Sequence, residues 1–218
     1  MQKLFAALTN FDEELRPSLK SLFKDLAHGQ SPEVLMFACC DSRVEPHLIA
    51  SQQPGELFIA RSIGNIVAPA DPNGVSVGDV SEASAIEYAI EVLGIRDIAV
   101  CGHSNCGAMA AVKKGRDHYA ALPNLRHWLQ HGEPALERVK SLQFTSKLND
   151  ADQLSQANVL TQLAHVATYD PVRKRLRQGE VRLHGLWFDI GSAMVHLYEA
   201  EKNAFVALDE TELTRLLS

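Results

Sequence analysis

Two short segments of the chain concentrate residue types that bind metals or move protons. The first is CCDSR at 39–43 and the second is HSNC at 103–106. Together they offer two thiolates and one imidazole, a borderline-soft donor set that suits Zn²⁺. Three protein ligands leave a fourth position open, which is typical of a catalytic zinc. Structural zinc sites normally have four protein ligands, often as paired C-x-x-C knuckles, and the chain contains no C-x-x-C.

The spacing of the second segment has a geometric meaning. We expect Cys106 in the first turn of a helix, with Ser104 or Asn105 as its cap, because a helix N-terminus favours an anionic thiolate. His103 is expected in the preceding turn, so that both side chains can reach one metal ion. The third ligand must then come from a neighbouring strand, and Cys39 ends one.

The remaining cysteines need separate interpretations. Cys39 and Cys40 are adjacent, and adjacent strand residues point to opposite faces, so only one should bind a metal. Sequence geometry slightly favours Cys39. Cys101 lies within a predicted strand, and we interpret it as a small buried hydrophobe.

Asp41 and Arg43 flank the first segment's metal ligand. A carboxylate beside an Arg keeps a low pKa and a fixed orientation, so the pair could accept a hydrogen bond or a proton from metal-bound water. The alternative is a plain turn ion pair with Ser42 capping. The neighbouring Cys39 and the H-x-x-C segment favour the catalytic interpretation.

The elements that must position these residues alternate along the chain. Apolar runs at 34–39, 56–60 and 97–101 predict buried parallel strands. Gly102 is expected to end the third strand. Helices are predicted at 79–93, from 106 to 112 and at 155–168, and a terminal strand or hairpin at 182–190 and 194–198. This order predicts an α/β fold with a mainly parallel central β-sheet flanked by helices. In such sheets ligands bind at the carboxyl ends of the strands, where both segments fall.

The N-terminal part has helical spacing over 3–28, with a break or a second helix near Pro17. No repeat or linker divides the chain. We therefore predict a single domain, 1–218, made of an N-terminal helical arm (1–30) and an α/β core (31–218).

Composition limits the possible partners. The net charge is −6 and no basic stripe is present, which argues against nucleic-acid binding. The basic run at 173–177 is interpreted as the solvated end of a helix. No apolar stretch approaches the ~20 residues that span a bilayer, and no export signal is recognisable, so we expect no membrane association and a cytoplasmic location with reduced cysteines.

Residues 39–46 (CCDSRVEP) and 101–109 (CGHSNCGAM) resemble the two signature segments of β-carbonic anhydrases. Residues 53–67, 84–94 and 184–190 are similar to the family as well. The resemblance implies that Cys39, His103 and Cys106 hold one Zn²⁺ per subunit. It also implies reversible hydration of CO2 to bicarbonate and a proton by zinc-bound hydroxide, which Asp41, held by Arg43, orients.

The same resemblance implies a substrate pocket for CO2 and bicarbonate, shared between two subunits of a homodimer with exchanged helical arms. The Gln30 amide would bind the substrate, Phe58, Ile63 and Tyr88 would form the apolar wall, and the Gly107 N–H would bind a substrate oxygen. Assembly beyond the dimer, to a tetramer or higher, stays open.

One position distinguishes two subtypes of the family. A regulated subtype carries a Trp three residues before the first zinc Cys, where this chain has Met36. With Gln30 present, the chain resembles the plant-like subtype, whose zinc keeps an open position. We therefore expect no shutdown of activity by bicarbonate.

Other functions fit the residues less well. A hydrolase of CS2 or COS would use the same ligands, whereas a thiol redox protein would need a strained Cys39–Cys40 disulfide. A zinc-storage or interaction protein would not need the Asp41–Arg43 pair, and a dinucleotide-binding protein would carry G-x-G-x-x-G after a strand. His28 and His47 are proton-shuttle candidates only by proximity in sequence, and an ordinary structural role is favoured for each.

Overall fold

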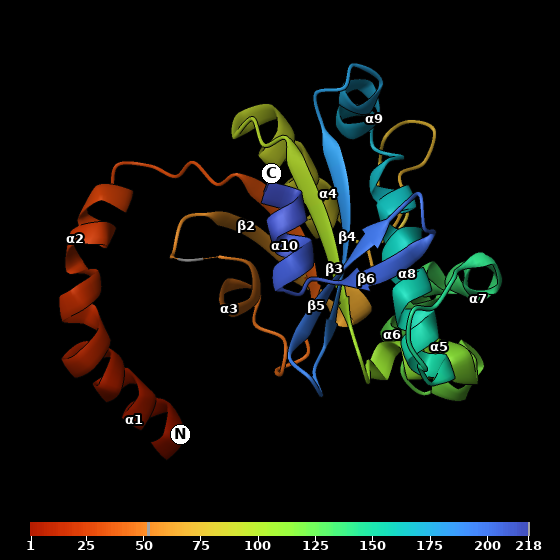
Figure 1. Ribbon diagram of the computed structural model, residues 1–218, viewed down its shortest axis with the longest axis horizontal. Coiled ribbons are helices and arrows are strands. Elements are labelled where there is room, and N and C mark those ends of the chain that lie inside the picture. Colours follow the sequence, from red (N-terminus) through yellow and green to blue (C-terminus); the bar gives the residue numbers. More distant parts are fainter. Residues whose placement is uncertain (52, 218) are drawn as a thin grey trace.

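The computed structural model describes residues 1–51 and 53–217 and is built around one six-stranded sheet (Figure 1). The strand order is β2-β1-β3-β4-β5-β6. The first four in this order run parallel, and β5 and β6 join as antiparallel strands. The strands are β1 (Val34–Cys39), β2 (Leu57–Ser62), β3 (Asp97–His103), β4 (Arg182–Asp189), β5 (Met194–Glu199) and β6 (Ala204–Ala207). The predicted α/β fold with a mainly parallel sheet is confirmed.

The strand β3 is longer than predicted, and this changes the placement of one site residue. Gly102 does not end the strand, because β3 continues to His103, paired with Phe188 of β4. A Cβ at Gly102 would come within 2.7 Å of Val159 Cγ2. This glycine therefore lets a helix pack closely on the sheet. His103 is the last residue of a strand, and its predicted position in a turn is wrong.

Helices cover the sheet and supply its core. The helical segments are α1 (Gln2–Asn10), η1 (Phe11–Leu15), α2 (Arg16–Leu26), α3 (Pro46–Ala50), η2 (Ile63–Asn65), α4 (Val80–Glu87), η3 (Tyr88–Val92), α5 (Gly107–Lys114), η4 (Arg116–Tyr119), α6 (Pro123–Leu129), η5 (Gln130–Gly132), α7 (Ala135–Arg138), η6 (Val139–Ser141), α8 (Asp150–Val166), α9 (Asp170–Arg177) and α10 (Glu210–Leu217). Leu35 and Ile98 of the sheet belong to the same buried apolar cluster as Ile86 of α4 and Ile90 of η3. Val159 of α8 belongs to this cluster too, and α8 packs on β3 and β4.

Local signals explain several helix boundaries. The predicted helix at 79–93 is α4 continued by the wider turn η3, and Gly94 ends it at φ 69°. The helix predicted at 155–168 begins earlier, because the Asn149 side chain accepts a hydrogen bond from the Asp152 N–H and caps α8. The basic run lies in the last turns of α9, as expected. No helix among the described residues is both long and apolar enough to cross a membrane.

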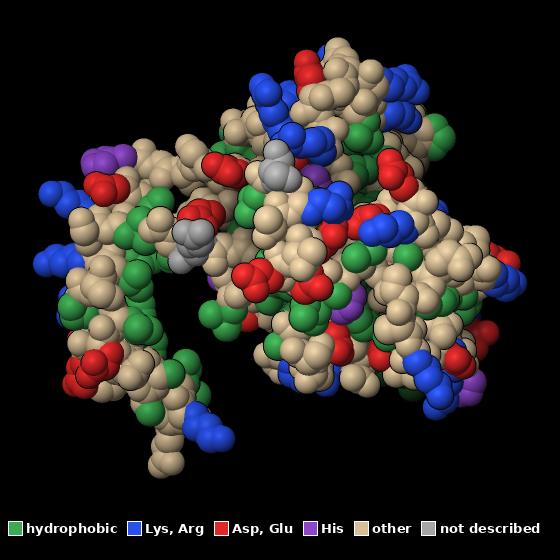
Figure 2. Space-filling view, viewed as in Figure 1, with side chains coloured by type: hydrophobic (Ala, Val, Ile, Leu, Met, Phe, Trp, Pro, Cys, Tyr) green, Lys and Arg blue, Asp and Glu red, His purple; other side chains and the backbone are tan. Residues whose placement is uncertain are grey.

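The N-terminal segments α1, η1 and α2 form an arm that projects from the rest of the molecule (Figure 1). Pro17 lies in the first turn of α2, where a proline is tolerated. Figure 2 shows hydrophobic side chains along the side of the arm that faces the body. The exposed apolar side chains of the arm are Leu4, Phe5, Leu8, Phe11, Leu15 and Phe23. Within one chain, this apolar side is not covered.

Candidate metal centre and active site

Three metal-binding side chains meet at the carboxyl edge of the sheet. Cys39 is the last residue of β1, His103 is the last residue of the neighbouring β3, and Cys106 directly precedes α5. One ligand atom from each lies within 4.8 Å of the others, and all three residues are buried. The structure thus brings together the three residues that the sequence singled out.

The His103 ring is oriented for metal binding. Its Nδ1 lies 2.9 Å from the Ser104 carbonyl oxygen. A carbonyl can only accept, so Nδ1 carries the hydrogen and Nε2 keeps a free lone pair. Nε2 is buried and has no hydrogen-bond partner among the described residues. A buried, unpaired imidazole nitrogen beside two thiols is the donor set that Zn²⁺ prefers, so the residues fit this ion.

The two thiols influence each other's ionisation. The neighbouring Cys106 thiol and the N–H groups of Asp41 and Gly64 lower the pKa of Cys39, against the opposite effect of burial. The pKa of Cys106 is raised, because its neighbour Cys39 and burial both disfavour a second thiolate. A bound dication would favour the thiolate form of both cysteines.

The cap of α5 differs from the prediction. Cys106 itself occupies the N-cap position, so neither Ser104 nor Asn105 caps the helix. The Ser104 hydroxyl instead accepts a hydrogen bond from the Ile190 N–H. Asn105 adopts a left-handed conformation at φ 55°, and its N–H donates to an Asp152 carboxylate oxygen at 2.6 Å. This tight turn places the Cys106 thiol at the N-terminus of α5. The predicted stabilisation of a Cys106 thiolate by the helix N-terminus therefore still applies.

Asp41 is fixed beside the three ligands. Arg43 donates Nε–H to Oδ1 at 2.9 Å, an NH2 hydrogen to Oδ2 at 2.7 Å, and its backbone N–H to Oδ1 at 3.0 Å. These bonds hold the pKa of Asp41 well below its usual range. The carboxylate Oδ2 lies 4.0 Å from His103 Nε2. Asp41 therefore stays ionised and points its carboxylate towards the centre.

The other two cysteines lie outside this group. Cys40 is exposed, and its N–H joins β2 by bonding the Ser62 carbonyl. Cys101 is 1% exposed, and burial raises its pKa to about 12. The geometry matches the interpretation of Cys39 as the ligand of the vicinal pair and of Cys101 as a buried hydrophobe.

The five predicted pocket residues divide into two sets. Gly107 follows Cys106 directly, and Ile63 precedes Gly64, whose N–H donates to the Cys39 sulfur at 3.4 Å. A Cβ at Gly107 would meet nothing within 4 Å, so space is open in front of its backbone. These two residues lie next to the centre.

Phe58, Tyr88 and Gln30 are not brought to the centre of their own chain. Phe58 and Tyr88 stack with ring centroids 5.9 Å apart. Phe58 of β2 pairs with Leu35 of β1. Leu35 precedes Cys39 by four residues, so Phe58 lies ~13 Å from Cys39 along the strand direction. Gln30 is exposed and precedes the opposite end of β1.

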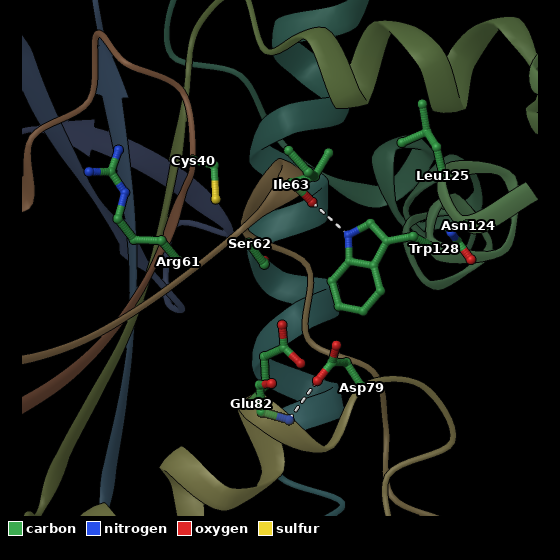
Figure 3. Close-up of a pocket in the computed structure, with 10 residues that line it drawn as sticks. Cys40, Arg61, Ser62, Ile63, Asp79, Glu82, Asn124, Leu125 and Trp128 are labelled. Atoms are coloured by element: carbon green, nitrogen blue, oxygen red, sulfur yellow. Dashed lines mark hydrogen bonds between the residues drawn. The ribbon is translucent and has the colours of Figure 1, made fainter. Parts of the chain in front are cut away.

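Sequence reasoning missed a cavity of about 490 Å³ beside the centre (Figure 3). Trp128 borders it and donates its indole N–H to the Ile63 carbonyl at 2.9 Å. Glu82 projects into it from α4 (Figure 3). A signal existed, since Glu82 precedes Ile86 by four residues and so places an acid on the apolar face of a predicted helix. The lining residues are Cys40, Arg61, Ser62, Ile63, Asp79, Ser81, Glu82, Asn124, Leu125 and Trp128.

Known proteins resemble this chain over nearly its whole length. The carbonic anhydrase family matches residues 34–195. A carbonic anhydrase of Pseudomonas aeruginosa is 38% identical over 212 residues, which cover 96% of this chain and 93% of that protein. A carbonic anhydrase of Synechocystis is 39% identical over 210 residues, 95% of this chain and 74% of that protein.

Solved structures agree. The β-carbonic anhydrase CcaA superposes with a TM-score of 0.85 at 36% identity, covering 95% of this chain and 98% of that one. A tetrameric β-carbonic anhydrase from the ascomycete Sordaria macrospora gives a TM-score of 0.72 at 27% identity, covering 90% and 97%.

The fold and the site define an α/β enzyme with a candidate metal centre at the carboxyl edge of its sheet. The chain belongs to the β-class carbonic anhydrases, which interconvert CO2 and bicarbonate.

Proposed function

We propose that this enzyme is zinc-dependent, with one Zn²⁺ per subunit held by Cys39, His103 and Cys106. The observation that carries the proposal is the buried His103 Nε2, which has no partner in the described part of the chain and faces two thiols within 4.8 Å. Zinc in such a site acts as a Lewis acid that lowers the pKa of a coordinated water and so supplies a nucleophile near neutral pH.

Asp41 orients the attacking water in this proposal. An ionised carboxylate accepts hydrogen bonds only, so it selects the orientation in which an oxygen lone pair is free to attack carbon. The three bonds from Arg43 keep Asp41 ionised and restrict its rotation. Preorganisation of this kind avoids reorienting the carboxylate during the reaction.

The substrate contacts support a dimeric enzyme. Ile63 and Gly107 flank the centre, whereas Gln30, Phe58 and Tyr88 lie away from it within one chain. We propose that a second subunit supplies these three residues: an apolar wall for CO2 and an amide for the oxygen that gains charge. The apolar side of the arm is uncovered in one chain (Figure 2). Each copy could bury this side by packing its arm against the other copy. The Sordaria macrospora relative is described as tetrameric.

We also propose the plant-like subtype. The position three residues before Cys39 is Met36 and not a tryptophan, and Met36 is 2% exposed and packs with Ala99 and Cys101. Asp41 is bonded to Arg43 and is not withdrawn from it. Bicarbonate should therefore cause only ordinary product inhibition. A crystal soaked in bicarbonate that showed Asp41 bound to the metal in an inactive form would contradict this assignment.

We assign the whole chain to one domain with a helical arm at 1–30, and the protein to the cytoplasm. All four cysteines are unpaired, which is typical of a reducing compartment. Fractionation of the source cells tests the location.

Stopped-flow CO2 hydration by the purified protein, before and after removal of metal by a chelator, tests the proposed activity. Turnover that depends on zinc supports it, and equal turnover without zinc contradicts it. The same assay run with CS2 and COS distinguishes a hydrolase of those substrates, since the ligands would be identical and only access to the centre would differ.

A further inference from the structure

Each hydration of CO2 releases one proton, and the centre described above contains no group that can carry it to solvent. Both carboxylate oxygens of Asp41 accept hydrogen bonds from Arg43, so this side chain is not free to carry a proton away from the centre. The two histidines considered from the sequence, His28 and His47, are exposed and do not line the cavity beside the centre. The cavity itself contains a better candidate.

Glu82 is a buried acid with one carboxyl oxygen left unpartnered. It is 8% exposed, and its Oε2 atom has no hydrogen-bond partner in the part of the chain that the structure describes. Figure 3 shows its side chain next to Asp79 among the residues that line the cavity. The Asp79 side chain accepts a hydrogen bond from Ser81 and caps α4, whereas Glu82 is left to interact with whatever enters the cavity.

The cavity borders the candidate metal centre through two residues. Cys40 directly follows Cys39, and Ile63 precedes the glycine whose N–H bonds the Cys39 sulfur. A cavity of about 490 Å³ is large enough to hold water molecules, and Asp79, Ser81 and Glu82 give that water polar partners. None of the three metal-binding side chains lines the cavity, so a water path from the centre to Glu82 has to pass Ile63 and Cys40.

The charged groups around Glu82 leave its carboxyl free to take up a proton. Arg61 lines the same cavity, but its guanidinium donates to the backbone carbonyls of Cys39, Asp41 and Val44. Asp79 adds a like charge, Cys40 is a thiol with a raised pKa, and the buried Tyr169 hydroxyl donates to the Ala68 carbonyl. Among the described residues no cation pairs with Glu82.

We infer that Glu82 accepts the proton released in each hydration, through water in this cavity, and passes it to buffer. The inference rests on the proposed hydration reaction. CO2 and water give bicarbonate and a proton; the O–H bond of the attacking water breaks, the proton moves along water to the Glu82 carboxylate, and the resulting carboxylic acid then protonates a buffer base. Burial, with a smaller contribution from Asp79, raises the pKa of Glu82 to about 7, which suits a group that must both take and release a proton near neutral pH.

The test is Glu82→Gln in the zinc-loaded enzyme, compared with wild type at matched zinc content. We expect kcat in dilute buffer to fall by about tenfold or more, while kcat/KM stays unchanged, because proton release follows the conversion of CO2. Imidazole at high concentration should restore kcat by accepting the proton directly. Exchange of ¹⁸O between CO2 and water should show slower release of labelled water and an unchanged rate of CO2–bicarbonate interconversion.

Two further variants serve as controls. Glu82→Asp keeps a carboxyl group and should retain part of the wild-type kcat. Glu137→Gln makes the same change on the exposed surface of α7 and should leave kcat unaffected. An unchanged kcat in Glu82→Gln, or a loss that imidazole does not relieve and that lowers kcat/KM equally, would overturn the inference. Absence of hydration by the wild-type enzyme would instead contradict the proposed function itself.

Discussion

Two acidic side chains near the candidate metal centre have opposite surroundings. Asp41 receives three hydrogen bonds from Arg43, and its pKa lies well below the usual range. Glu82 has an unpartnered oxygen in a cavity, and burial raises its pKa to about 7. One acid is thus oriented and kept ionised by its Arg43 partner, and the other can exchange protons near neutral pH.

The comparison teaches that surroundings, more than residue type, set the role of a carboxyl group. Asp41 owes its partner to a local motif, because Arg43 is only two residues away. Glu82 owes its isolation to distant parts of the chain, since the cavity walls come from β2, α4 and α6. Variants that alter one acid and leave the other intact can separate the two roles.

The largest effect is expected from removing the centre that both acids serve. His103→Ala or Cys106→Ala should lose bound zinc and reduce CO2 hydration to the uncatalysed rate, since a site with two remaining ligands neither holds nor positions the ion. Metal analysis of each variant by mass spectrometry, together with stopped-flow hydration, measures this. Cys101→Ala is the matched control, because Cys101 is a buried cysteine outside the metal-binding group. Full activity in either ligand variant would contradict the assigned ligands.

The next effect comes from removing the negative charge of the oriented acid. Asp41→Asn should keep zinc and lower kcat/KM by about 100-fold, the upper range for groups that orient a metal-site ligand. Its amide can no longer act only as an acceptor towards the attacking water. Unaltered zinc content with strongly reduced turnover supports the role, and full turnover would show that Asp41 is not needed.

A third variant tests the isolated acid through stability. The unfolded pKa of Glu82 is near 4.5 and the folded pKa is about 7, so the folded protein binds more protons between these values. The free energy of unfolding of the wild type therefore falls as the pH rises from 4.5 through 7, because the buried carboxyl must ionise. Glu82→Gln has no carboxyl to ionise, so above pH 7 the variant should be more stable than wild type by up to about 3 kcal/mol. Urea unfolding at pH 5 and pH 8 measures the difference. Equal urea midpoints for the two proteins at pH 8 would show that Glu82 finds a partner.

The smallest effect is expected from weakening the hydrogen bonds that Arg43 donates to Asp41. Arg43→Lys keeps the positive charge but cannot reproduce the two parallel bonds of the guanidinium fork. We expect a loss of about tenfold in kcat/KM with unchanged zinc content, less than for Asp41→Asn. A loss as large as that of Asp41→Asn would mean that Arg43 acts on the reaction directly.

The features that the sequence predicted correctly depend on residues that are close together along the chain. The apolar run at 34–39 is β1 residue for residue, and the motifs that follow β1 and β3 supply the ligand group. Parallel strands bring their carboxyl ends to one edge, so the meeting of Cys39 with His103 follows from the fold class.

The features that sequence missed depend on contacts between distant segments. The extension of β3 past Gly102 depends on pairing with Trp187 and Phe188 of β4, and the placement of Cys106 as a cap depends on a turn held by Asp152. The strand β6 and the helix α10 are short, four and eight residues, and neither was predicted. The cavity around Glu82 requires α6 to cross the end of β2, which no local pattern indicates.

The central claim is that one zinc ion per subunit, bound at Cys39, His103 and Cys106, makes this chain a CO2-hydrating enzyme. Metal analysis of the purified protein, paired with CO2 hydration before and after chelation and again after zinc is restored, tests it most directly. We predict one zinc per chain, loss of hydration with loss of metal, and recovery with zinc. Full hydration by metal-free protein, or stoichiometric zinc without hydration, would contradict the claim.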